Sequence, residues 1–175
     1  MAIIETKDLT YTYGTGTPFE KTAVDHVNLS IEQGEFTIIV GPSGAGKTTV
    51  FNLLTGVYTP TKGAIRFEGK SIIGKKPYQI NRIGIARTFQ NIRLFKNMTV
   101  LDNIKVAMNQ NMTYSVISGM FRLPSYWKQE KRVDEKARQL LSLFDMEEVG
   151  EHQAGNLPYG QQRKLEILRA LASEP

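Results

Sequence analysis

The chain of 175 residues contains no cysteine, two histidines and one tryptophan. The lack of cysteine excludes a disulfide framework and thiol chemistry, which fits a cytoplasmic setting. Long apolar runs are also missing, because the longest are only a few residues, far below the ~20 needed to span a bilayer. The first residues do not read as a signal peptide. We therefore expect any membrane function to require partner chains.

Positive charge is in mild excess, since the chain has 22 Lys and Arg against 17 Asp and Glu and a net charge of +5 at pH 7. The basic residues are scattered and form no stripe interleaved with aromatics, so the pattern does not favour a nucleic-acid partner. A hydrophobic content of 41% is sufficient for a buried core. Length and composition predict one domain over residues 1–175.

Residues 41–48 read Gly-Pro-Ser-Gly-Ala-Gly-Lys-Thr and match the pattern G-x-x-x-x-G-K-[ST]. They follow the apolar run 36–40, which predicts a buried strand. Such a loop lets successive N–H groups point into one concavity that accepts phosphate oxygens at the N-terminus of the next helix. Lys47 would reach the β- and γ-phosphates of ATP, and the Thr48 hydroxyl would bind Mg²⁺. The predicted ATP-binding residues here are Gly41, Ser43, Gly44, Ala45, Gly46, Lys47, Thr48 and Thr49. The alternative is a glycine-rich turn with a solvated lysine.

A second motif covers residues 156–163, Asn-Leu-Pro-Tyr-Gly-Gln-Gln-Arg, and precedes apolar residues at helical spacing. This pattern predicts a loop that leads into a helix. Pro158 suits the first helical turn, where its missing N–H costs nothing. Gly160 leaves the backbone uncovered near a helix N-terminus, where an anion is favoured. The alternative interpretation is a loop and helix with a structural role only.

In this order, the two motifs resemble those of the ATP-binding-cassette ATPases, whose signature is Leu-Ser-Gly-Gly-Gln followed by Gln-Arg and a helix. Here Pro158 and Tyr159 replace the serine and the first glycine, a form similar to that of branched-chain amino-acid importers. The resemblance implies that this loop faces ATP held by a partner subunit, without the serine contact to the γ-phosphate. The signature residues are Leu157, Pro158, Tyr159, Gly160 and Gln161.

The resemblance also implies roles for two residues outside these motifs. Gln90 matches the glutamine that contacts Mg²⁺ or its water and senses the transmembrane partner, so Lys47 and Gln90 are the predicted catalytic residues and Thr48 and Gln90 the predicted metal ligands. Tyr13 matches the aromatic residue that stacks on adenine, a contact that needs a π-face and little else. The alternatives are a surface-loop glutamine and an ordinary strand tyrosine.

The predicted fold is α/β, a P-loop NTPase core of mostly parallel sheet with helices, plus an N-terminal antiparallel β-subdomain and a helical subdomain. Residues 1–90 would form the β-subdomain and core, and residues 91–175 the helical subdomain with the signature. Expected strands cover residues 3–13, 24–31, 36–40, 64–68 and 83–86, and expected helices cover 47–54 and much of 98–144. The apolar segment 115–127 either closes the helical subdomain's own core or presents a patch to a membrane-embedded partner.

In the family that the chain resembles, the signature helix leads into a strand ending in Asp-Glu and later into a loop histidine. The sequence ends at Pro175 before such a strand, and neither His26 nor His152 lies in the family's histidine position. The resemblance therefore implies an incomplete C-terminal part, and we expect little ATP hydrolysis unless another acid, such as Glu166 or Glu174, substitutes. Residues 1–50 look more like other branches of the family than residues 51–175 do.

Three functions follow as hypotheses. The first is the ATP-binding subunit of a branched-chain amino-acid importer, which would use ATP and Mg²⁺. It would act as a homodimer or heterodimer of nucleotide-binding subunits with transmembrane permease subunits, at the cytoplasmic face of the cell membrane. The second is a truncated or engineered module that binds ATP without turnover. The third is a cassette protein acting on nucleic acid or ribosomes, which the apolar segment 115–127 disfavours.

Overall fold

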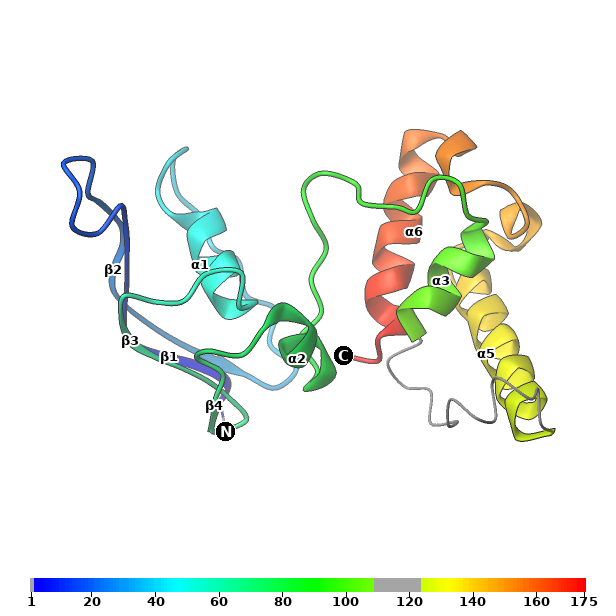
Figure 1. Ribbon diagram of the computed structural model, residues 1–175, viewed down its shortest axis with the longest axis horizontal. Helices are drawn as coiled ribbons and strands as arrows, with labels where there is room; N and C mark the ends of the chain where they lie inside the picture. Colours follow the sequence, from blue (N-terminus) through cyan, green and yellow to red (C-terminus); the bar gives the residue numbers. More distant parts are fainter. Residues whose placement is uncertain (1, 109–123) are drawn as a thin grey trace. The chain divides into compact units, whose positions relative to one another are not determined.

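The computed structural model describes residues 2–108 and 124–175 of the chain (Figure 1). These residues form two compact units, Met1–Ile83 and Gly84–Pro175. The first contains a β-sheet with two helices, and the second is helical. The apolar segment 115–127 falls mostly outside the described residues, and only residues 124–127 of it, at the start of the helix Pro124–Ser142, belong to the part described.

The sheet of the first unit has four strands in the order β2-β1-β3-β4, and every neighbouring pair is antiparallel. The strands are β1 (Ala2–Tyr13), β2 (Lys21–Glu32), β3 (Lys62–Phe67) and β4 (Lys70–Ser71). The central strand β1 therefore pairs with β2, its neighbour in sequence, and with β3, which follows about fifty residues later. The strands predicted over residues 3–13, 24–31 and 64–68 are confirmed within one to three residues.

Two helices complete the first unit, α1 (Lys47–Leu54) and α2 (Pro77–Arg82). The helix predicted over residues 47–54 is confirmed with the same bounds. Its apolar side is buried, as are the inward residues of the sheet, because alternate strand residues and every third or fourth helix residue share one face. The fully buried apolar side chains of this unit are Leu9, Leu53, Ile65 and Ile80.

The strands predicted over residues 36–40 and 83–86 are wrong for this structure. Residues 35–40 have no regular structure, and the side chains of Phe36, Ile38 and Val40 are 88%, 67% and 83% exposed. Residues 83–86 form a turn and an irregular stretch. An apolar run becomes a buried strand only where a neighbouring strand satisfies its backbone. None of the four strands in the described residues pairs with either segment.

The second unit packs three helices, α3 (Val100–Met108), α5 (Pro124–Ser142) and α6 (Tyr159–Ala172). Short 3₁₀ turns at Glu147–Val149 and Ala154–Asn156 connect α5 to α6. The helical character predicted within 98–144 is confirmed for α3 and α5, and the predicted helix after the second motif is confirmed as α6. The core of the second unit is a single cluster of buried side chains: Val100, Leu101, Ile104, Met108, Val133, Ala137, Leu141, Met146, Ala154, Leu157, Leu165, Leu168 and Ala172.

Asp134 on α5 joins two helices of this unit, because its carboxylate forms ion pairs with Lys105 on α3 and, at 2.8 Å, with Arg138. The hydrogen bond from Lys105, followed by that from Arg138, holds the pKa of Asp134 below its ordinary value of 3.8. A lowered pKa means that the carboxylate stabilises the fold above pH 3.8 and that this contribution is lost as pH falls through the folded pKa.

We therefore expect Asp134→Asn to lower the free energy of unfolding at pH 7 by about 0.5–1 kcal/mol, a value that allows for solvent screening of a partly exposed pair. The difference from the unchanged chain should be smaller at pH 3, below the ordinary pKa of 3.8. Urea unfolding at the two pH values measures this. Glu135→Gln, at an exposed neighbouring position, is the control. A difference that persists undiminished at pH 3 would contradict the electrostatic explanation.

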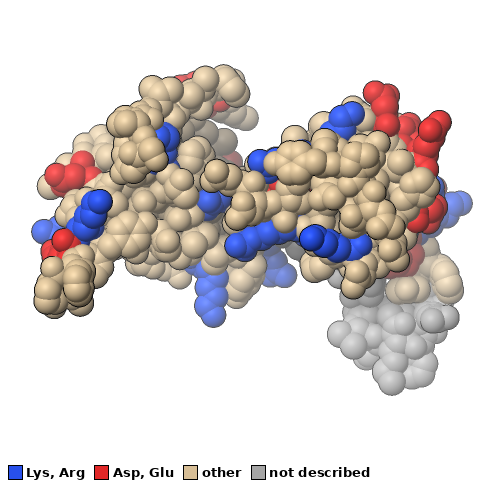
Figure 2. Space-filling view, turned by 90° about the horizontal axis from the view of Figure 1, so that it is seen from above, with Lys and Arg blue, Asp and Glu red and all other residues tan. Residues whose placement is uncertain are grey.

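The surface drawn in Figure 2 carries Lys and Arg side chains interspersed with residues of other kinds, and Asp and Glu lie on the same face. Among the described helices, none combines the length and the apolar character required to cross a bilayer.

Candidate nucleotide-binding site

The phosphate loop, residues 41–48, lies between the exposed segment that follows β2 and the first turn of α1. Gly44 and Gly46 adopt φ values of 81° and 82°, in the left-handed region that favours glycine. Gly46 is also packed against β2, since a Cβ built on it would lie 2.3 Å from the carbonyl oxygen of Ala23. The glycine pattern recognised in the sequence therefore corresponds to a backbone shape and a close approach that other residues cannot adopt.

The loop and the start of α1 present backbone amides without acceptors. Within residues 2–108 and 124–175, the N–H groups of Ser43, Gly44, Gly46, Lys47 and Thr48 donate to no protein atom, whereas Ala45 donates to the Pro42 carbonyl at 3.3 Å. The first turn of α1 holds no acidic residue. Unpaired amides and the positive end of a helix dipole together make a concave site that favours an anion.

Lys47 lies across the loop, and its Nζ donates to the carbonyl oxygens of Gly41 and Pro42 at 2.7 and 2.8 Å. The ammonium is therefore held over the same backbone whose amides are unpaired. The Thr48 side chain is exposed, and no partner contacts its hydroxyl in the described part of the chain. These residues fit a bound triphosphate, with an ammonium for the phosphate oxygens and a hydroxyl for a hard cation. They would supply phosphate binding and metal coordination.

Tyr13 lies beside this loop through Thr49, the buried second residue after Lys47, with 3.1 Å between its hydroxyl and Thr49 Oγ1. Its ring, 38% exposed, meets the rings of Tyr11 and Tyr58 edge-on, with centroids 4.9 and 5.9 Å apart. Tyr11 and Tyr58 stack on each other at 5.1 Å. A hydrogen bond with Tyr13 raises the pKa of the Tyr58 hydroxyl. The structure thus brings Tyr13 to the phosphate loop as part of a three-tyrosine cluster.

Gln90 lies in the second unit, exposed at a bend. The preceding residue, Phe89, is held to α6 at both backbone groups: its N–H donates to Glu166 Oε1 at 3.0 Å, and its carbonyl accepts from Arg163 Nη1 at 2.7 Å. Glu166 and Arg163 also form an ion pair at 2.9 Å. Gln90 therefore has an exposed side chain on a backbone that is fixed immediately before it.

The signature loop, residues 157–161, begins with a buried residue and then becomes exposed. Leu157 is 6% exposed within the core of the second unit, and its carbonyl accepts from Gln162 Nε2 at 2.8 Å. Pro158 is the N-cap of α6, and Tyr159 is 68% exposed. A Cβ at Gly160 would meet no atom within 4 Å. The loop thus presents the N-terminus of α6 at the surface, as the sequence predicts.

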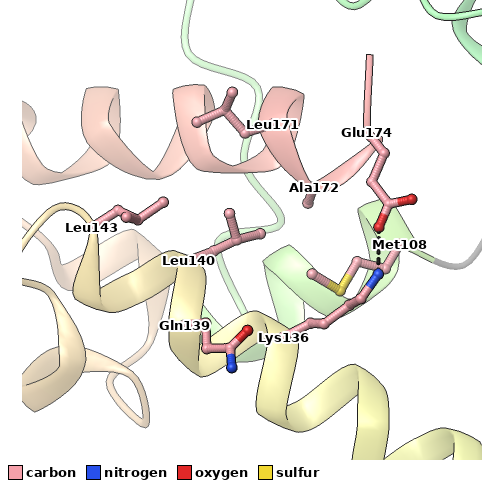
Figure 3. Close-up of a pocket in the computed structure, with 8 residues that line it drawn as sticks. All are labelled: Met108, Lys136, Gln139, Leu140, Leu143, Leu171, Ala172 and Glu174. Carbon is pink, nitrogen blue, oxygen red and sulfur yellow. Dashed lines mark hydrogen bonds and ion pairs between the residues drawn. The ribbon is translucent and has the colours of Figure 1, made fainter.

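A cavity of about 340 Å³ lies elsewhere in the second unit and involves none of the predicted site residues. Figure 3 shows Leu140 of α5 and Leu171 of α6 on its wall, and Lys136 joined to Glu174 across one end. The distance of this ion pair is 2.6 Å. The cavity is lined mainly by apolar side chains, and its charged residues Lys136 and Glu174 pair with each other, so it does not resemble a nucleotide site.

The sequence did not predict the contact of Tyr58 with Tyr13, or the contacts of Arg163 and Glu166 with Phe89, the residue before Gln90. Tyr58 gave no signal, because its contact with Tyr13 joins segments 45 residues apart in the chain. The hypothesis that Glu166 or Glu174 acts as a substitute acid is not supported by their contacts, because each accepts from a basic partner. In the described part of the chain, no cluster of three or more Asp, Glu, His or Cys could hold a metal.

Comparison with known proteins defines the class. The family model described as ABC transporter matches residues 24–175. The chain is 42% identical over 173 residues to the high-affinity branched-chain amino acid transport ATP-binding protein BraF of Pseudomonas aeruginosa, covering 99% of the chain and 66% of BraF. It is 42% identical over 153 residues to the protein LivG of Escherichia coli, which bears the same description, covering 87% of the chain and 60% of LivG.

Solved structures agree. An ATP-binding cassette of an ABC transporter in its ADP conformation is 34% identical, with a TM-score of 0.78, and covers all of this chain and 66% of the other. A bacterial ABC transporter cassette solved as a dimer is 28% identical, with a TM-score of 0.77, over 98% and 70% of the two chains. The fold is therefore that of the α/β P-loop NTPases, as predicted, but the mostly parallel sheet that was also predicted is not found among the described residues, whose strand pairs are all antiparallel. The chain belongs to the ABC transporter family, and it spans 60–66% of the length of the curated relatives named above.

These comparisons confirm the resemblance to branched-chain amino-acid importer ATPases that the phosphate loop and the signature indicated. They also show that its unusual signature does not exclude family membership. Among the solved relatives, one cassette is described in an ADP conformation and another as a dimer.

Proposed function

We propose that this chain is the nucleotide-binding part of an ABC importer ATPase for branched-chain amino acids. The observation that carries the proposal is the phosphate loop, with its unpaired amides, Gly46 fitted against Ala23 and Lys47 held across it. The names of BraF and LivG support the substrate class. The solute itself would be selected by other subunits.

The proposed ligands are ATP and Mg²⁺. The amides of residues 43–48 would bind phosphate oxygens, Lys47 would neutralise charge on the β- and γ-phosphates, and Tyr13 would stack on adenine. Thr48 and Gln90 would be the protein ligands of Mg²⁺, which uses few protein groups beside phosphate and water. The bound ion would neutralise charge that develops on the γ-phosphate during attack by water. Lys47 and Gln90 are the residues we assign to catalysis.

The proposed assembly is a dimer of nucleotide-binding subunits on transmembrane permease subunits, at the cytoplasmic face of the membrane. A related cassette solved as a dimer supports the first part. In such a dimer, the exposed N-terminus of α6 and residues 157–161 would face the nucleotide of the partner copy, where a helix dipole favours an anion. The scattered basic residues do not favour nucleic acid as the partner.

Calorimetric titration of the purified chain with ATP, with and without Mg²⁺, tests the proposal. Saturable binding at one site per chain, strengthened by Mg²⁺, is the expected result. Phosphate release measured in parallel, with Lys47→Ala to detect contaminating ATPase, separates turnover from binding alone. No ATP binding by the folded chain would contradict the proposal.

Tyr13 offers a separate test of the adenine contact. If its ring stacks on adenine, Tyr13→Ala should weaken ATP binding by about 1–3 kcal/mol. Tyr13→Phe keeps the ring and loses only the hydroxyl contact with Thr49, which is present without nucleotide, so we expect little loss of ATP affinity. Dissociation constants from calorimetry give both values, and Tyr78→Ala, at an exposed tyrosine of α2, is the control. Equal losses for Ala and Phe would assign the effect to the hydroxyl rather than to stacking.

A further inference from the structure

The segment between α2 and α3 has little regular structure, yet side chains from α3 and α6 satisfy its backbone. Asn103, fully buried on α3, accepts from the N–H of Phe95 and donates to its carbonyl, both at 3.0 Å. Arg169 on α6 donates to the carbonyl of Arg93. Phe89 is held at both backbone groups, as described above. Backbone hydrogen bonds that a sheet would normally supply are here replaced by side chains.

The contact at Phe89 differs from the others because it involves a buried carboxylate, that of Glu166. The Glu166 side chain is 7% exposed, and its two oxygens accept from different donors, the Phe89 amide and Arg163. The hydrogen bond to Glu166 is the main cause of the raised pKa of Arg163. A buried carboxylate persists only when it is paired, and losing one partner leaves the other unsatisfied. Loss of any one of these three groups would therefore leave the other two each lacking a partner.

The Phe89 ring is fixed as well, since the guanidinium groups of Arg87 and Arg93 lie 5.1 and 4.8 Å from its centroid. Gln90 comes next in the chain, with its own side chain exposed. A functional side chain that must meet a ligand benefits from a fixed backbone, because less freedom is lost on binding. Glu166 and Arg163 supply this fixation from the same helix that carries the signature loop at its start.

We propose that Glu166 and Arg163 are positioning residues for Gln90, acting through the backbone of Phe89. This inference rests on the proposed function, in which Gln90 contacts Mg²⁺ bound with ATP. Neither residue touches nucleotide in the proposal. They fix the backbone position from which the Gln90 side chain extends, and they link that position to α6.

The test uses Glu166→Gln, which preserves size but places an amide N–H₂ where a carboxylate oxygen faces either the Phe89 amide or Arg163. ATP affinity is measured by calorimetry in Mg²⁺ and in EDTA, for the whole chain. We expect the gain in affinity that Mg²⁺ provides to fall about 10-fold, as is typical when a group supporting a metal ligand is lost. Affinity in EDTA should be unchanged.

A double-mutant cycle with Gln90→Ala separates positioning from general stability. Once Gln90 is removed, Glu166→Gln should have little further effect on the Mg²⁺-dependent gain, because coupled residues are non-additive. Arg163→Gln is the second variant, in case Glu166→Gln unfolds the chain, and the amide exchange of Phe89 reports directly on the lost hydrogen bond. Glu174→Gln, which removes the exposed ion pair with Lys136 in the same unit, should leave the Mg²⁺ effect unchanged.

The outcomes are distinct. If the unchanged chain binds no ATP, both the proposed function and the positioning role are overturned. If it binds ATP and Glu166→Gln keeps the full Mg²⁺ effect, only the positioning role is overturned. Equal weakening in Mg²⁺ and EDTA, or additive effects with Gln90→Ala, would assign Glu166 to folding alone and would also overturn it.

Discussion

Replacing Lys47 with alanine is expected to weaken ATP binding about 10- to 150-fold, because a charge-assisted hydrogen bond is worth roughly 1.5–3 kcal/mol. In the structure the ammonium donates to the carbonyls of Gly41 and Pro42, so it is already held over the loop that would receive the phosphates. Binding of phosphate would exchange these neutral acceptors for charged ones, which are stronger partners.

Calorimetry of Lys47→Ala with Mg²⁺ and ATP measures the loss. Lys70→Ala, at an exposed position of β4, controls for the general effect of removing one positive charge, and should change affinity little. A melting temperature equal to that of the unchanged chain would show that the loop survives. Unchanged ATP affinity in Lys47→Ala would remove this loop from the binding site.

Gly46→Ala is expected to disrupt the phosphate loop far more than Gly44→Ala. The two glycines have nearly the same φ, 82° and 81°, so an added methyl group carries the same backbone strain of about 1–2 kcal/mol at each. Only at Gly46 would the Cβ meet an atom, the Ala23 carbonyl oxygen at 2.3 Å. Overpacking of this kind costs typically about 1–3 kcal/mol more, and a backbone oxygen in β2 cannot rotate away.

Amide exchange of peptides from α1 and β2, followed by mass spectrometry without nucleotide, reports on this region separately from the helical unit. Gly46→Ala should raise the exchange of these peptides well above that of Gly44→Ala, and peptides from α5 should be unaffected. Equal exchange in the two variants would mean that the loop moves away from Ala23 at little cost, and would contradict the close packing seen here.

The elements that the sequence predicted correctly depend on residues that lie close together in the chain. The bounds of α1 follow from the phosphate-loop pattern, since the glycines end where a helix can begin, and α6 follows from Pro158 and the apolar spacing after it. Hairpin β1–β2 was predictable because the alternating strands and the turn residues Gly14, Gly16 and Pro18 lie close together in the chain. The family could be recognised from two motifs alone.

What the sequence could not predict depends on distant partners. Phe36, Ile38 and Val40 form an apolar run that reads as a buried strand, but burial requires a neighbouring strand that the run itself does not encode. Glu166 lies within α6, and nothing in the neighbouring sequence indicates that its carboxylate accepts a hydrogen bond from the amide of Phe89, 77 residues away in the chain. At both places burial depends on partners distant in the chain rather than on the local pattern.

The position of the phosphate loop, between two strands of the sheet in the chain, affects how the sheet folds. The loop and α1 are inserted between β2 and β3, both of which pair with β1. Closing the sheet therefore requires ordering the chain between residues 32 and 62, which costs loop-closure entropy that the hairpin β1–β2 does not incur. A nucleotide that orders this insertion on binding would offset part of that entropy loss with binding free energy, and so favour the pairing of β1 with β3. At a nucleotide concentration of about 100 times its dissociation constant, such linkage is worth about 2.7 kcal/mol, and proteolysis between β2 and β3 should slow accordingly.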